Sequence, residues 1–133
     1  FVLTAKNAAE LCLFAAEHMK GGEIFLKNMG VAAIRDVATA LAEPGQELQF
    51  KVIGRRPAEK EFEELSTEDE AERSYETKKG FVILPEILDN MPLDVIENFR
   101  YIETNFQRAK KALRSDQHSP MSVEAIREFF RNS

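Results

Sequence analysis

The stretch Glu47-Leu48-Gln49-Phe50-Lys51-Val52-Ile53 decides the fold class, because apolar and polar side chains alternate along it. Alternation with a period of two predicts a strand in a sheet that has one more polar face. Upstream, the short apolar stretch 23–26 predicts a first strand, and the apolar spacing over 34–41 predicts a helix between the two. A strand, a crossover helix and a second strand form a right-handed unit. We therefore expect a mixed α/β fold, with a small strand-helix-strand sheet layer and flanking helices.

Further helices are expected on both sides of this unit. Thr4 is a suitable N-cap for a first helix that ends at Gly21-Gly22, and Ser122 is a suitable N-cap for the last helix. Ser66 followed by Asp69 predicts the cap of a short helix between them.

Between residues 81 and 114 the sequence predicts another strand and a longer helix. The strand is Phe81-Val82-Ile83-Leu84, which Pro85 stops. The helix follows Pro92 and has a basic carboxyl-terminal end over 107–114. Its apolar side chains recur at three-four spacing: Val95, Ile96, Phe99, Ile102 and Phe106. We expect this stripe to belong to the core, and an interface with another subunit or a missing domain is the second interpretation.

Two arginines and a glutamate follow the predicted second strand, in the sequence Gly54-Arg55-Arg56-Pro57-Ala58-Glu59-Lys60. If residues 47–53 form a strand, both arginines lie near its carboxyl end, where ligands of α/β sheets gather. Guanidinium groups bind phosphate oxygens through paired, charge-assisted hydrogen bonds, and the Glu59 carboxylate can accept a hydrogen bond from a sugar hydroxyl. The stretch is therefore a candidate diphosphate site, and a solvated charge cluster is the alternative.

Composition narrows the class of protein. The 133 residues are enough for one domain with a core. A formal net charge of −5 argues against nucleic acid as a partner, because nonspecific binding needs an excess of Lys and Arg. No apolar run is long enough to span a membrane. The single cysteine, Cys12, fits a reducing compartment and a cytoplasmic location, and its apolar neighbours predict a buried side chain. The first residue, Phe1 rather than Met, indicates that upstream sequence is missing.

Several stretches, taken in order, resemble one family. After a strand, a helix and a strand they are Gly54-x-Arg56-Pro57-x-Glu59-Lys60, then 65–71, 81–83 and 121–128. The chain resembles the extended short-chain dehydrogenase/reductases of polysaccharide biosynthesis, in the UDP-N-acetylglucosamine 4,6-dehydratase and 5-epimerase group. The resemblance covers most of the chain and is weakest over 87–117.

This resemblance implies that residues 1–133 are the carboxyl-terminal, substrate-binding portion of an extended Rossmann-type enzyme. The NAD or NADP site and the catalytic Tyr and Lys are then expected in a missing N-terminal Rossmann domain. The implied partners are a UDP-sugar, that domain and, in a homo-oligomer, further copies of the chain. The alternative is a non-catalytic interaction module that binds no nucleotide and contacts a protein partner through the acidic residues of 59–76 and the helix of 95–106.

The resemblance also assigns roles to the candidate site. Arg56 and Glu59 match the family's Arg-Pro-Gly-Glu positions, which implies that Arg56 contacts the UDP diphosphate and Glu59 the uridine ribose. Arg55 is expected to be a second phosphate contact on chemical grounds alone, and Lys60 to support the loop. Ala58 replaces the family's glycine, and its methyl group disfavours a positive φ.

Two other patterns are assigned no catalytic or metal-binding role. Tyr75 and Lys79 have the Tyr-x-x-x-Lys spacing of short-chain dehydrogenases, but they lie in an acidic stretch that predicts an exposed helix. No Gly-x-Gly-x-x-Gly loop is present, so we expect this chain alone to bind no nicotinamide cofactor and to hold no catalytic residue. The acidic residues of 59–76 lack a calcium-loop pattern, and His18 and His118 lack ligand spacing, so no metal site is expected.

Overall fold

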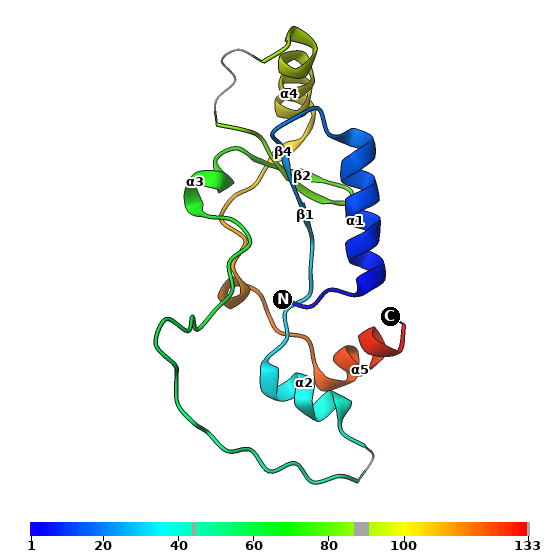
Figure 1. Cartoon of the computed structure of the whole chain (residues 1–133), viewed down its shortest axis with the longest axis vertical. Helices are drawn as coiled ribbons and strands as arrows, with labels where there is room; N and C mark the ends of the chain where they lie inside the picture. The colour runs from blue at the N-terminus through cyan, green and yellow to red at the C-terminus, as the bar shows by residue number, and fades with distance from the viewer. Residues whose placement is uncertain (44, 87–90, 133) are drawn as a thin grey trace.

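The computed structural model describes residues 1–43, 45–86 and 91–132, and its architecture is mixed α/β, as predicted (Figure 1). In chain order the elements are α1 Ala5–His18, β1 Ile24–Lys27, α2 Ile34–Leu41, α3 Glu68–Ala71, β2 Ser74–Thr77, β3 Gly80–Ile83, α4 Leu93–Asn105, β4 Gln107–Arg108, the 3-10 turn η1 Ser115–Gln117 and α5 Val123–Arg131. Figure 1 shows the sheet in the upper half with α1 and α4 beside it, and α2 packed against α5 in the lower half.

The strands form one antiparallel sheet in the order β1-β3-β2-β4. The central strand β3 pairs with β1 on one side and with β2 on the other. The predicted strand-helix-strand unit is therefore wrong, because the neighbour of β1 is β3 and residues 47–53 lie in no strand. A strand needs a partner for its backbone groups as well as alternating side chains, and no described residue provides one for 47–53.

A tight turn joins β2 to β3 and brings the hairpin close to β1. At Gly80, φ is 145° and an added Cβ would lie 2.0 Å from the carbonyl oxygen of Leu26, so this approach requires glycine. The predicted exposed helix around Tyr75 is wrong, since Tyr75 belongs to β2 and only 2% of it is exposed. The Tyr75 hydroxyl oxygen accepts a hydrogen bond from Nη2 of Arg108 at 3.1 Å, and this bond raises the pKa of Arg108 above its ordinary value.

The main core lies between the sheet and α4. Its buried members are Tyr75, Val82, Leu84, Val95 and Phe99, and the partly buried Phe25, Met91, Ile102 and Phe106 pack against them. The stripe along α4 is therefore a core face, as predicted. The basic end predicted for this helix is not helical, because α4 ends at Asn105 and Gln107–Arg108 pair with β2 as β4.

The helix starts agree closely with the local sequence. The hydroxyls of Thr4 and Ser122 each accept a hydrogen bond from the amide three residues later, at 3.0 and 3.2 Å, as their predicted capping roles require. The short helix α3 is capped by Thr67 rather than by the predicted Ser66. Ser66 is buried, and its hydroxyl instead accepts from the amide of Leu113 at 2.9 Å.

Helix α1 packs through one face only. Its Phe14 ring meets the ring of Phe25 edge-on, with 5.9 Å between their centroids. Cys12 is exposed, so the prediction of a buried cysteine is wrong. Leu13 is also 67% exposed, which means that apolar neighbours in the sequence did not indicate burial here.

The chain exposes more surface than a compact protein of its mass. Its accessible surface is 9887 Å², whereas a compact monomer of 15.1 kDa exposes about 7,100 Å². Much of the long connection between α2 and α3 contributes to this excess. Residues 45–61, hereafter the arc, form an extended trace that lies away from the sheet, and all of them except Leu48 are exposed (Figure 1).

Candidate functional site

The three predicted site residues, Arg55, Arg56 and Glu59, lie in the arc (Figure 1). Their predicted position at the carboxyl end of a strand is wrong, because residues 47–53 form no strand and the arc lies away from the sheet. The side chains of all three are exposed. The structure nevertheless brings Arg56 and Glu59 together in one turn.

This turn is closed by the backbone and by one side chain. The Arg56 amide donates to Oε2 of Glu59 at 2.8 Å, and the Glu59 amide donates to the carbonyl oxygen of Arg56 at 3.1 Å. Between them Ala58 has a φ of 66°, in the left-handed region that glycine favours. The methyl group thus does not prevent the positive φ at the position where the family motif has glycine. Gly54, with a φ of 78°, precedes the turn.

The two arginines of the turn differ in what they contact. The Arg55 side chain pairs with the Glu61 carboxylate through Nη1 and Oε1. The Arg56 guanidinium forms no ion pair within residues 1–43, 45–86 and 91–132. The turn therefore presents one guanidinium and the second oxygen of Glu59 to solvent. Such a pair can bind an anion and a hydroxyl donor at the same time.

The downstream end of the arc is fixed to the segment before η1. The Ser115 amide donates to the carbonyl oxygen of Glu63 at 2.8 Å, and the Arg114 guanidinium lies 4.0 Å from the centre of the Phe62 ring. Arg114 also pairs with Asp116, with 2.8 Å between Nη2 and Oδ2, and this hydrogen bond raises the pKa of Arg114. The turn at Arg56 is thus anchored a few residues downstream.

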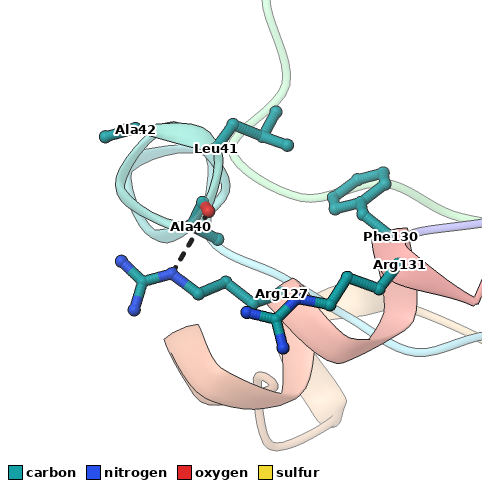
Figure 2. A pocket seen from close by; sticks show the side chains of 6 residues that line it. All are labelled: Ala40, Leu41, Ala42, Arg127, Phe130 and Arg131. Atoms are coloured by element: carbon teal, nitrogen blue, oxygen red, sulfur yellow. Dashed lines mark hydrogen bonds between the residues drawn. The ribbon is translucent and has the colours of Figure 1, made fainter. Parts of the chain in front are cut away.

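Sequence reasoning missed a groove between α2 and α5 (Figure 2). It has a volume of about 380 Å³ and is lined by Ala40, Leu41, Ala42, Arg127, Phe130 and Arg131. Arg127 donates from Nε to the carbonyl oxygen of Ala40 and from Nη2 to that of Thr39, both at 3.3 Å. The last carbonyls of a helix have no partner within the helix, so Arg127 supplies donors to the end of α2. The sequence contains no local signal for a contact between residues this far apart.

Neither a metal site nor a membrane-spanning helix is found in the part of the chain that the structure describes. There, no group of three or more His, Cys, Asp and Glu side chains is arranged to hold a metal ion. None of the helices in these ranges has the length and apolar character needed to cross a membrane.

Comparison with known families agrees with the sequence pattern. A family model described as polysaccharide biosynthesis protein matches residues 1–85, which is more than half of the chain. The chain belongs to this family of polysaccharide biosynthesis proteins. The match includes the whole turn at Arg56 but stops before α4.

Several relatives of this polysaccharide biosynthesis protein carry names. An uncharacterized membrane protein of Methanocaldococcus jannaschii is 32% identical over 86% of the chain and 37% of the relative. The UDP-N-acetylglucosamine 4,6-dehydratase (inverting) of Campylobacter jejuni is 33% identical over 65% of the chain and 25% of the relative. The UDP-glucose 4-epimerase of Rickettsia felis is 27% identical over 99% of the chain and 38% of the relative.

A solved structure resembles the whole chain. The X-ray structure of Pen from Bacillus thuringiensis matches with a TM-score of 0.77 and 28% identity, over 100% of this chain and 37% of that one. The chain thus spans between a quarter and two fifths of the length of the curated relatives named above and of this structure.

Proposed function

We propose that this chain is the substrate-side portion of an NAD(P)-dependent nucleotide-sugar 4,6-dehydratase or epimerase of polysaccharide biosynthesis, and that its turn at Arg56 binds the UDP part of a UDP-amino sugar. The family match over residues 1–85 carries this proposal. Relatives named as a UDP-N-acetylglucosamine dehydratase and a UDP-glucose epimerase support the substrate class.

The geometry of the turn suggests how the UDP group is held. The Arg56 guanidinium has no ion-pair partner among the described residues. We therefore assign it to the diphosphate. Glu59 uses one carboxylate oxygen to close the turn and offers the other to a ribose hydroxyl. Arg55 must leave Glu61 before it can reach a phosphate, so we assign it the smaller share of the binding.

A nicotinamide dinucleotide does not fit the residues present. The first two helices of the chain are α1 and α2, and they begin after Thr4 and Ala33 rather than after a glycine-rich turn. We therefore place the NAD or NADP site, together with the catalytic residues, in an N-terminal Rossmann domain outside residues 1–133. In this arrangement the present chain contributes binding energy that orients the sugar.

Two further parts of the proposal concern class and location. The alternative of a non-catalytic interaction module is not favoured, because relatives over most of the chain are named as enzymes. We also propose a cytoplasmic location, since a chain with one cysteine fits a reducing compartment.

Calorimetric titration with UDP and UDP-N-acetylglucosamine tests this proposal, using the full-length polypeptide encoded by the gene. Hydrogen bonds to charged groups contribute about 1.5–3 kcal/mol each, so Arg56→Ala should weaken UDP binding by about tenfold or more. Arg55→Ala should cost less, because its guanidinium is shared with Glu61.

Arg131→Ala is the matched control, because it removes an exposed arginine from α5 and leaves the turn unchanged. UDP binding that is absent from the full-length polypeptide, or that Arg131→Ala weakens as much as Arg56→Ala does, contradicts the proposal.

A further inference from the structure

The stretch that follows the arc pairs in an antiparallel manner with the segment that leads into η1 (Figure 1). The Leu65 amide donates to the carbonyl oxygen of Leu113, and the Ser115 amide donates to that of Glu63, both at 2.8 Å. The Glu63 amide donates in turn to the Ser115 hydroxyl, also at 2.8 Å. Glu63 and Ser115 lie 52 positions apart in the sequence, so this pairing fixes the end of the arc to a distant segment.

Within this pairing, Arg114 covers an aromatic ring. Its guanidinium carbon lies 4.0 Å from the centre of the Phe62 ring. Two hydrogen bonds to the Asp116 carboxylate, from Nε at 3.1 Å and from Nη2 at 2.8 Å, hold the guanidinium in one orientation. Phe62 is half-buried, whereas residues 53–61 are exposed. The Phe62 ring is therefore the point at which the chain that leaves the turn at Arg56 becomes packed again.

We propose that Arg114 is a positioning residue for the candidate UDP site, because by holding Phe62 it fixes the downstream end of the turn that carries Arg56 and Glu59. The inference rests on the proposed function. Glu59 lies three residues before Phe62, a stretch of chain that spans at most about 11 Å. A turn that is already fixed does not have to be ordered when the nucleotide binds, so its affinity for UDP is higher. Arg114 acts in this way without touching the ligand.

The upstream side of the turn is held less firmly. The Arg35 guanidinium lies 4.8 Å from the centre of the Phe50 ring, and 44% of Phe50 is exposed. Among the residues that the structure describes, no backbone hydrogen bond joins 47–53 to another element. The contacts at Phe62 therefore have the larger share in positioning the turn.

Arg114 belongs to a segment that the family match does not cover. The match ends at residue 85, whereas Arg114 and Asp116 follow α4 and β4 in the chain. The proposed role of Arg114 therefore comes from its contacts with Phe62 and Asp116 and not from the family motif.

Calorimetric titration of the full-length polypeptide with UDP tests this inference. Arg114→Ala should weaken UDP binding by about threefold to tenfold, because the turn must then be ordered during binding. Adding Phe62→Leu to this variant should weaken the binding no further, since both substitutions remove the same contact. Arg131→Ala, which removes an exposed arginine from α5, is the matched control and should leave the affinity unchanged.

Two single variants of Phe62 separate positioning from a direct contact between Arg114 and phosphate. Phe62→Tyr keeps an aromatic ring under the guanidinium and should keep the affinity for UDP. Phe62→Leu keeps an apolar side chain but removes the ring, so it should weaken UDP binding by about threefold or more. A direct phosphate contact by Arg114 would instead leave the affinity of both variants unchanged.

Amide hydrogen exchange measures the fixing of the turn without a ligand. The Glu59 amide donates to the carbonyl oxygen of Arg56 within the turn. This amide should exchange at least about threefold faster in the Arg114→Ala variant, because the turn opens more often. The amides of β2 and β3 should keep their protection, which shows that the variant is folded. A merely stabilising role of Arg114 would lower the urea midpoint and leave both the Glu59 exchange and the UDP affinity of the folded protein unchanged.

Equal UDP affinity, or equal Glu59 exchange, in Arg114→Ala and the unsubstituted polypeptide overturns the inference. Binding that Arg56→Ala weakens and Arg114→Ala does not leaves the proposed function in place and removes the positioning role. Faster Glu59 exchange in Arg114→Ala without any UDP binding contradicts the proposed function, while it still supports the fixing of the turn by Arg114.

Discussion

At the scale of single residues, Ala58 has a backbone conformation that suits glycine better. Its φ of 66° costs an alanine about 1 kcal/mol relative to glycine. Ala58→Gly should therefore let the free chain adopt the turn more often and raise the affinity for UDP by up to about fivefold. Ala58→Val, with its branched side chain, should lower the affinity. Calorimetry on the full-length polypeptide measures both, and an unchanged affinity in both variants would show that the turn is not limiting.

At the scale of elements, Arg127 joins α2 to α5 by donating to the carbonyl oxygen of Ala40 (Figure 2) and to that of Thr39. Arg127→Ala should lower the free energy of unfolding by about 1 kcal/mol, since two partly exposed hydrogen bonds are lost. Arg131→Ala, one helical turn later and also lining the groove, should cost less. Urea unfolding measures the difference through the transition midpoint. Equal midpoints for the two variants would mean that Arg127 does not stabilise the end of α2.

The same scale shows which parts of the fold were predictable. Thr4 and Ser122 were identified as caps because a cap bond reaches only three residues along the chain. The strand β3 was likewise found from its apolar run. The order of the strands in the sheet could not be predicted, since the pairing of β1 with β3 joins residues more than fifty positions apart. Tyr75 was misplaced for the same reason, because its burial depends on α4 and β4 rather than on its acidic neighbours.

At the scale of the whole molecule, the sequence predicts which residues form the candidate site but not where the site lies relative to the sheet. The residue spacing that suggested Arg56 and Glu59 acting together corresponds to a real turn. Their predicted position beside a sheet is not found, because residues 47–53 form no strand in the structure. The groove of Figure 2 was missed because it forms where α2 meets α5. At this scale the chain also has an accessible surface of 9887 Å², which is larger than that of a compact monomer of its mass.

The arc is also a stretch in which a protease can cut the chain into two large fragments. A cut in this stretch breaks a covalent link but leaves two large pieces in contact, through the β1–β3 ladder and the packing of α2 on α5. Brief trypsin treatment of residues 1–133 should cut first at Lys51, Arg55 or Lys60, all exposed in this stretch. The two fragments should then elute together in gel filtration and separate only in denaturant. Fragments that separate in native buffer would show that the β1–β3 and α2–α5 contacts are too weak to keep the fragments together once the peptide connection is cut. A nicked protein that stays whole would mean that the turn at Arg56 lies on a connection between two halves rather than inside either one.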